Sequence, residues 1–180
     1  YLTDIYNVIH SEFVPLFNPF QSYFDHLPSW DGVSDPIGDL ADTVHVKSDQ
    51  AEFRDYFRKW FVGILPALLD DTVVNHEILV LIGEQGLYKT TWFNFLLPPE
   101  LRFGYTDSID FKSKQDAERS LGRFFLINID EFDQISVNQQ GFLKHLLQKP
   151  VANLRKPYGT AIQEIRRYAS FIATSNQKAL

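Results

Sequence analysis

The chain has 180 residues, of which 44% are hydrophobic and 22% are charged, and this size and balance predict one globular domain with a core of its own. It contains no cysteine, which excludes disulfide bonds and zinc–thiolate sites. The formal net charge of −6 and the pI of about 5.3 argue against non-specific binding of polyanions by the domain as a whole.

No apolar run of the sequence approaches the ~20 residues needed to cross a bilayer, and the first residues lack the pattern of a secretory signal. We therefore expect no membrane partner and a cytoplasmic location. The chain starts at Tyr1 and contains no methionine, from which we expect it to be a fragment of a longer protein.

The first 75 residues predict a small helical region. Prolines and glycines break residues 1–48 into short pieces, which hold one or two short helices. We expect the aromatic side chains of these pieces to pack onto the rest of the chain, and Trp30 to anchor a turn as a buried indole. Residues 49–70 predict one packing helix capped by Ser48 or Asp49, because apolar residues recur there at helical spacing: Phe53, Tyr56, Phe57, Trp60, Phe61, Ile64 and Leu65.

From residue 76 onward, strand patterns alternate with helix patterns, which predicts an α/β fold with a parallel sheet and helices on its faces. The expected elements, in chain order, are a strand at 78–82, a helix that ends near 97, a short strand near 104–106, a polar helix at 113–121, a strand at 123–129, a helix at 138–149, a hairpin within 151–165 and a strand at 169–176.

The stretch from residue 77 to 97 predicts a strand, a phosphate-binding loop and a helix. Small residues in such a loop let backbone N–H groups surround phosphate oxygens, and the start of the next helix favours an anion. We expect Lys89 to reach the β- and γ-phosphates of a nucleotide and the Thr90 hydroxyl to bind Mg²⁺. The candidate nucleotide-binding residues are Gly83, Gly86, Tyr88, Lys89, Thr90 and Thr91.

Tyr88 departs from the general pattern G-x-x-x-x-G-K-S/T, which has a glycine immediately before the lysine. A positive φ at Tyr88 would cost energy that a glycine would not. We therefore expect an altered loop shape or a weaker hold on the nucleotide. The alternative is that the glycines and the lysine belong to an ordinary strand-to-helix turn.

Two further strands end in polar residues, and ligands of doubly wound sheets bind at the carboxyl ends of the strands. Asp130 and Glu131 follow the strand at 123–129, and Asn176 ends the last strand. We expect Asp130 to hold Mg²⁺ through its water shell and Glu131 to accept a proton from the attacking water. Asn176 is expected to bind the γ-phosphate or that water. Each feature alone is also typical of an ordinary surface-ended strand.

Basic residues gather late in the chain. Four of them are candidate contacts to DNA or to a neighbouring subunit: Arg155, Lys156, Arg166 and Arg167. A solvated surface is the other interpretation of such a cluster.

Taken together, these segments resemble the virulence-associated protein E family, whose P-loop domain is similar to the superfamily 3 helicases of phage and plasmid primase–helicases. The resemblance rests on residues 18–20 with Tyr23, on 30–32, on the loop at 83–91, on Asp130-Glu131, on 155–159, and on Arg166-Arg167 followed by 173–176.

This resemblance implies a P-loop NTPase core of the additional-strand type in residues 76–180, truncated at its C-terminus, after a helical region in residues 1–75. It also implies ATP and Mg²⁺ as cofactors, and a homo-oligomeric ring on DNA in a replication or mobile-element protein. In the family's terms Lys89 and Thr90 bind phosphate and metal, Asp130 and Glu131 are the acidic pair, and Asn176 is the sensor. The basic hairpin would contact DNA or a neighbouring subunit.

Three functions compete. The first is an ATP-hydrolysing, helicase-like domain. The second is a nucleotide-binding or degenerate P-loop scaffold without turnover, which Tyr88 favours. The third is a small-molecule phosphotransferase, against which Glu131 and Asn176 weigh because they suit hydrolysis.

Overall fold

A four-stranded parallel sheet forms the centre of the computed structural model, which describes residues 1–180 except 10, 12, 15–16, 71, 156–161 and 178–180. The strand order is β1 (Ile78–Ile82), β6 (Ser170–Ser175), β3 (Leu126–Ile129) and β2 (Tyr105–Thr106). The last strand of the chain, β6, therefore lies between β1 and β3 and pairs in parallel with both. The predicted α/β fold class is confirmed.

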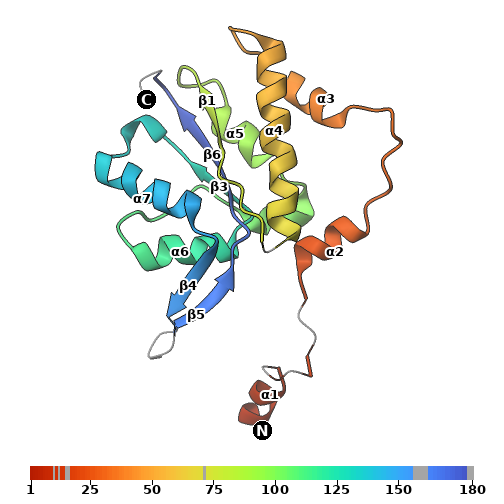
Figure 1. Cartoon of the computed structure of the whole chain (residues 1–180), viewed down its shortest axis with the longest axis vertical. Coiled ribbons are helices and arrows are strands. Elements are labelled where there is room, and N and C mark those ends of the chain that lie inside the picture. The colour runs from red at the N-terminus through yellow and green to blue at the C-terminus, as the bar shows by residue number, and fades with distance from the viewer. Residues whose placement is uncertain (10, 12, 15–16, 71, 156–161, 178–180) are drawn as a thin grey trace.

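Helices cover both faces of this sheet (Figure 1). One hydrophobic cluster lies on the side of α4 (Gln50–Leu69) and α5 (Lys89–Asn94), and a second lies on the side of α6 (Lys114–Arg123) and α7 (Val137–Gln148). β3 supplies both clusters alternately: Leu126 belongs to the first, Ile127 to the second. This alternation is the period of two that a strand buried on both faces requires.

The long helix α4 starts where the sequence predicts, because the Asp49 side chain accepts hydrogen bonds from the backbone N–H groups of Ala51 and Glu52. Its apolar face carries Trp60, whose indole N–H donates to the Phe171 carbonyl of β6 at 3.0 Å. The helical region at 1–75 thus shares one core with the sheet. A domain boundary near residue 76 stays a prediction.

In the described part of the first 48 residues, three short helices, not one or two, precede α4: α1 (Leu2–Ile9), α2 (Pro19–Asp25) and α3 (Pro36–Asp42). Figure 1 shows α1 standing apart from the body, and all its residues are exposed. The expectation of a buried indole at Trp30 is wrong, because this side chain is 69% exposed. The indole still anchors the turn, because its N–H donates to the Ser34 carbonyl at 2.9 Å. The Asp31 carboxylate adds hydrogen bonds from the N–H groups of Val33 and Ser34.

The remaining elements are short. Two 3-10 helices, η1 (Pro99–Gly104) and η2 (Phe132–Gln134), follow α5 and β3, and a separate antiparallel pair forms from β4 (Val151–Arg155) and β5 (Ile162–Arg166). The hairpin predicted within 151–165 is confirmed in its two strands, while its turn lies outside the described residues. None of the described helices has the length and apolarity to span a membrane.

Candidate functional site

Three loops meet at the carboxyl edge of the sheet, where β1, β6 and β3 end. Two side-chain hydrogen bonds connect these loops. Lys89 Nζ donates to Asn176 Oδ1 at 3.2 Å, and the Thr90 hydroxyl donates to Asp130 Oδ1 at 2.9 Å. Four residues singled out from the sequence, separated by up to 87 positions, thus lie within one hydrogen-bonded cluster.

The loop after β1 folds around its own lysine. Its first N–H, that of Gly83, donates to the Ser175 carbonyl at 3.1 Å, which fixes the loop to β6. Gly86 has a φ of 89°, a conformation that glycine adopts without steric cost. Lys89 Nζ then donates to the carbonyls of Gly83 at 2.6 Å and Glu84 at 2.9 Å. The ammonium therefore sits inside the curve of the loop.

Tyr88 has a φ of 56° and a ψ of 25°, so this residue does adopt the left-handed conformation considered from the sequence. For a residue with a Cβ this conformation costs roughly 1–2 kcal/mol. Its side chain is 77% exposed and therefore does not fill the loop. Tyr88 therefore differs from the glycine of the general pattern in its backbone strain, and its side chain does not block the loop. Thr91 follows on the exposed side of the six-residue helix α5.

The acidic pair is held by Thr174, a residue that the sequence analysis passed over. The Thr174 hydroxyl donates to Asp130 Oδ1 and accepts a 3.4 Å hydrogen bond from the backbone N–H of Glu131. Glu131 has a φ of 51°, and its side chain is exposed at the edge of the sheet. The buried Thr174 hydroxyl thereby contacts the side chain of Asp130 and the backbone of Glu131.

Asp133 is a second residue that the sequence analysis missed. Its Oδ1 accepts hydrogen bonds from the Ser175 hydroxyl and the Asn176 backbone N–H, both at 3.1 Å. The Asn176 N–H is the main reason that the pKa of the Asp133 carboxyl lies below its usual range, and the nearby Lys89 charge adds to the effect. In the sequence, Asp133 is marked only by being an acid three residues after Asp130, and this spacing does not distinguish it from an ordinary surface acid.

The expectation that Arg167 contacts DNA or a neighbouring subunit is corrected by its burial. This residue is only 4% exposed, and its guanidinium donates to five backbone carbonyls. Three of the carbonyls belong to the end of α7 and the residue after it, one to Asn75 and one to Ala169. Burial lowers the pKa of Arg167 to about 10, which leaves it charged at neutral pH. Its role is structural.

The other basic candidates are placed only in part. Arg166 is half-buried, donates to the Leu68 carbonyl at 2.9 Å and lies over the Tyr168 ring at 5.2 Å. Arg155 ends β4, but its side chain is outside the described part of the structure, as is Lys156 entirely. Their expected contacts with DNA stay predictions.

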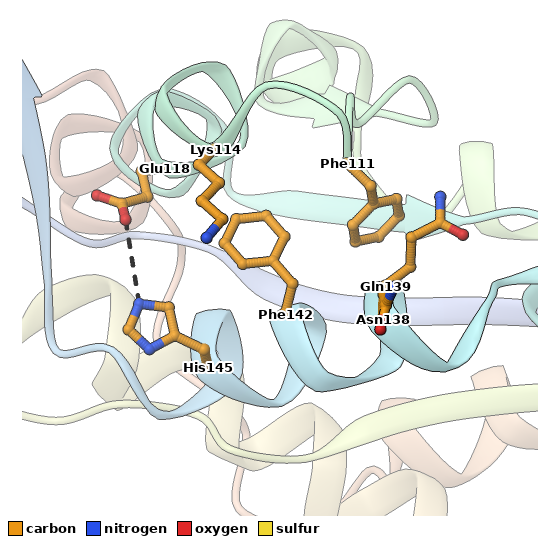
Figure 2. A pocket seen from close by; sticks show the side chains of 7 residues that line it. All are labelled: Phe111, Lys114, Glu118, Asn138, Gln139, Phe142 and His145. Atoms are coloured by element: carbon orange, nitrogen blue, oxygen red, sulfur yellow. Dashed lines mark ion pairs between the residues drawn. The ribbon is translucent and has the colours of Figure 1, made fainter.

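A separate hollow of about 510 Å³ lies between α6 and α7 (Figure 2). The Phe142 ring at its centre stacks on His145 at 6.2 Å and meets Phe111 edge-on at 6.5 Å. Glu118 lies 4.0 Å from His145, the pair that the dashed line marks. Phe142 and His145 thus pack against each other in this hollow, and the cluster at the sheet edge does not line it.

The oxygens at the sheet edge suit one kind of metal. A threonine hydroxyl and a carboxylate are ligands that Mg²⁺ accepts, in company with water and phosphate oxygens. Among the described residues, no group of three or more histidine, aspartate or glutamate side chains is arranged to hold a metal ion by protein ligands alone. Thr90 and Asp130 therefore fit a metal that arrives with a polyphosphate.

Comparison with known proteins supports the resemblance drawn from the sequence. The virulence-associated protein E-like domain matches residues 24–180. The A form apo structure of the NrS-1 C-terminal region matches with a TM-score of 0.50 at 16% identity, over 79% of this chain and 32% of that chain. A second structure of that region gives 0.50 at 15% identity, over 78% and 32%.

At such identities the structural likeness shows the fold alone, and this chain spans about a third of the length of those chains. No curated protein matches the sequence. The family match covers most of the chain, and on that ground the chain belongs to the virulence-associated protein E-like family.

Proposed function

We propose that this chain is an ATP-binding and ATP-hydrolysing P-loop domain of the superfamily 3 helicase type, working in DNA replication or in a mobile genetic element. The observation that carries the proposal is the pair of hydrogen bonds Lys89–Asn176 and Thr90–Asp130, which joins three strand ends into one cluster. The position of β6 between β1 and β3 agrees with a core of the additional-strand type.

In this proposal Lys89 exchanges its partners when nucleotide binds. Its ammonium now donates to two loop carbonyls and one amide oxygen, which are neutral acceptors. Phosphate oxygens are negatively charged, so at the same distance they attract the ammonium more strongly than neutral carbonyl or amide oxygens do. Binding of the β- and γ-phosphates therefore draws Nζ away from Asn176 and frees the amide oxygen of Asn176 to face the attacking water or the γ-phosphate.

The acids have distinct tasks in the proposed reaction. Thr90 and Asp130 hold Mg²⁺, which would neutralise the charge on the β- and γ-phosphates. Glu131 accepts the proton of the attacking water, and its exposed carboxylate at the sheet edge is accessible for that task. Thr174 keeps the two acids in fixed relation, because its hydroxyl contacts the side chain of one and the backbone of the other.

DNA is the proposed partner of an assembled homo-oligomeric ring. The net charge of −6 places any contact with phosphates on a local basic surface and not on the domain as a whole. The β4–β5 hairpin with Arg155 and Lys156 is the proposed surface, and Arg166 beside it is the proposed residue that acts across a subunit boundary. The family match supports this assignment by analogy.

The test is binding and hydrolysis of ATP with and without Mg²⁺. We expect Mg²⁺-dependent binding that Lys89→Ala weakens by roughly 100-fold or more, because the charge-assisted bonds to phosphate are lost. Glu131→Gln is expected to bind like the wild type but to lose roughly 10²–10⁴-fold in turnover. Lys144→Ala, an exposed lysine of α7, is the matched control and should change neither quantity.

The outcomes separate the candidate functions. Turnover that is equal in wild type, Lys89→Ala and Glu131→Gln contradicts the proposal. Mg²⁺-dependent binding without turnover indicates the scaffold, and transfer of the γ-phosphate to a metabolite instead of water indicates a phosphotransferase.

A further inference from the structure

The helix α1 carries an apolar face that the single chain leaves exposed. Its apolar and aromatic residues recur at the spacing i, i+3, i+4 and i+7, which places them on one side of the helix: Leu2, Ile5, Tyr6 and Ile9. Their exposed fractions range from 47% at Ile5 to 84% at Leu2. A helix of 8 residues is marginal by itself in water, so this face favours packing against another surface.

An apolar hollow of about 360 Å³ lies on the body of the molecule. It is bounded by α2, by α4 and by the segment that follows α5, and the described residues that line it are all apolar or aromatic. Among them Leu27 is 46% exposed, whereas Trp60 and Leu101 are buried. Exposed apolar surface of this kind marks a site of interaction.

The face of α1 and this hollow match each other in chemistry. Amphipathic helices bind apolar grooves through side chains at i, i+3, i+4 and i+7, and this is the spacing on α1. Asp4 lies on the opposite, polar side of the helix with Thr3 and Asn7, so the apolar face brings no charge to the hollow. Contact between the two surfaces would remove both from water, which is the main favourable term in association.

Within one chain the two surfaces do not meet, because every residue of α1 is exposed and Figure 1 shows α1 apart from α2 and α4. A second copy of the chain supplies the same hollow to this helix. Residues 10–18 separate α1 from α2, and a segment of this length spans at most about 30 Å, which bounds how far away that copy can lie. Since a helix face and a hollow are different patches, the contact is heterologous, and contacts of this type can close into rings.

We propose that α1 of one chain docks its apolar face in the hollow between α2 and α4 of a neighbouring copy, and that this contact joins the subunits. The inference rests on the proposed function for its homo-oligomer and deepens it by naming the two surfaces that meet. Ile5, in the middle of the apolar face, is the expected anchor. Leu27, which follows α2, is the expected exposed contact on the other side.

The first test joins the two surfaces covalently. The chain contains no cysteine, so Ile5→Cys and Leu27→Cys chains each carry a single thiol. The two variants are purified separately, mixed without nucleotide and oxidised. We expect disulfide-linked dimers in the mixture, several-fold more than either variant gives alone. Asn7→Cys, on the polar side of α1, is the matched control and should give several-fold fewer dimers with Leu27→Cys.

The same cysteines identify other occupants of the hollow. An internal disulfide in the double variant Ile5→Cys/Leu27→Cys, without dimers in the mixture of single variants, would show that α1 docks on its own chain and would overturn the inference. A wild type that stays monomeric and gives no cross-link in either experiment would overturn it as well.

The second test places a charge on each surface. Ile5→Asp and Leu27→Asp put an unpaired carboxylate into the apolar contact, so we expect association between copies, measured by sedimentation equilibrium, to weaken at least about tenfold. Asn7→Asp and Val62→Asp add the same charge at exposed positions outside the two surfaces, and should change association by less than about twofold. Equal association in all four variants contradicts the inference.

Failure of the inference is separable from failure of the proposed function, because cross-linking and sedimentation need no nucleotide. Cross-linked dimers in a protein that binds no ATP support the inference and contradict the proposed ATPase alone. An oligomer that hydrolyses ATP and is unaffected by Ile5→Asp contradicts the inference alone.

Discussion

The strand β6 has a polar cluster at each of its ends, and the two clusters are built in opposite ways. Before its amino end, Arg167 is buried and donates only to backbone carbonyls, which are fixed by the fold. After its carboxyl end, the Asn176 side chain accepts a hydrogen bond from the side chain of Lys89. Among the described residues, a positive φ without glycine occurs at Tyr88 and Glu131, both of which belong to this second cluster.

The contrast indicates that the cluster before β6 serves stability and that the cluster after β6 serves ligand binding. A charged group whose partners are all backbone carbonyls contributes to the stability of the fold and has no free donor for a ligand. A cluster of side chains that bond one another, with strained residues beside it, stores interactions that a ligand can replace. The comparison predicts that substitutions before β6 change the free energy of unfolding, and that substitutions after it change nucleotide binding.

The largest expected effect is that of Arg167→Leu. Five backbone carbonyls lose the charged donor that Arg167 supplies, and the cost of leaving such groups unsatisfied predicts a loss on the order of 3–5 kcal/mol in the free energy of unfolding. Urea denaturation followed by circular dichroism measures it. Arg123→Leu, an exposed arginine of α6, is the control and should stay within about 0.5 kcal/mol of the wild type. A small loss in Arg167→Leu, accompanied by weaker DNA binding in the assembled protein, would restore the original expectation for this residue.

The second prediction concerns Asp133, which lies beside the carboxyl end of β6. Asp133→Ala removes the acceptor that holds the Asn176 backbone, so we expect turnover of ATP to fall roughly tenfold with little change in ATP affinity. Asp133→Asn keeps an oxygen in the same place and should recover most of the activity. If the alanine variant loses stability and affinity together, or if the asparagine variant rescues nothing, Asp133 does not act by positioning Asn176.

The pH dependence of this contact follows from the direction of the pKa shift. The pKa of Asp133 is lower in the folded chain than the ordinary value of about 3.9, so its contribution is complete above that value and is lost as the pH falls through the folded-state pKa. We therefore expect the contribution of Asp133 to stability to be constant between about pH 5 and pH 8, and the difference in stability between wild type and Asp133→Asn to shrink in acid. Unfolding curves at pH 3 and pH 7 measure it.

The sheet and the meeting of its loops were predictable because they depend on local patterns. Apolar runs that end in Gly83, Asp130 and Asn176 predict strands, and parallel strands place their carboxyl ends at one edge. The nucleotide, the metal and the roles of the residues stay predictions.

The partners of single side chains were not predictable, because they depend on contacts between distant segments. Arg166 and Arg167 are adjacent arginines that the sequence does not distinguish. Arg167 is buried because its guanidinium donates to carbonyls at the end of α7. Asn128 sits inside an apolar run, where nothing local distinguishes a buried amide from an exposed one. The burial of Trp30 was mispredicted for the same reason, although its indole N–H does donate within the turn, to the Ser34 carbonyl.

The smallest expected effect concerns the strained residue of the loop. Tyr88→Gly removes a left-handed strain of roughly 1–2 kcal/mol but adds a chain-entropy cost of about 0.5–1 kcal/mol, so the free energy of unfolding should rise by no more than about 1.5 kcal/mol. Leu87→Gly, at an exposed neighbour without a positive φ, adds only the entropy cost and should lower stability. Opposite signs for these adjacent glycine substitutions, measured by urea denaturation, would show that the loop is strained at Tyr88, while equal losses would place Tyr88 among ordinary surface residues.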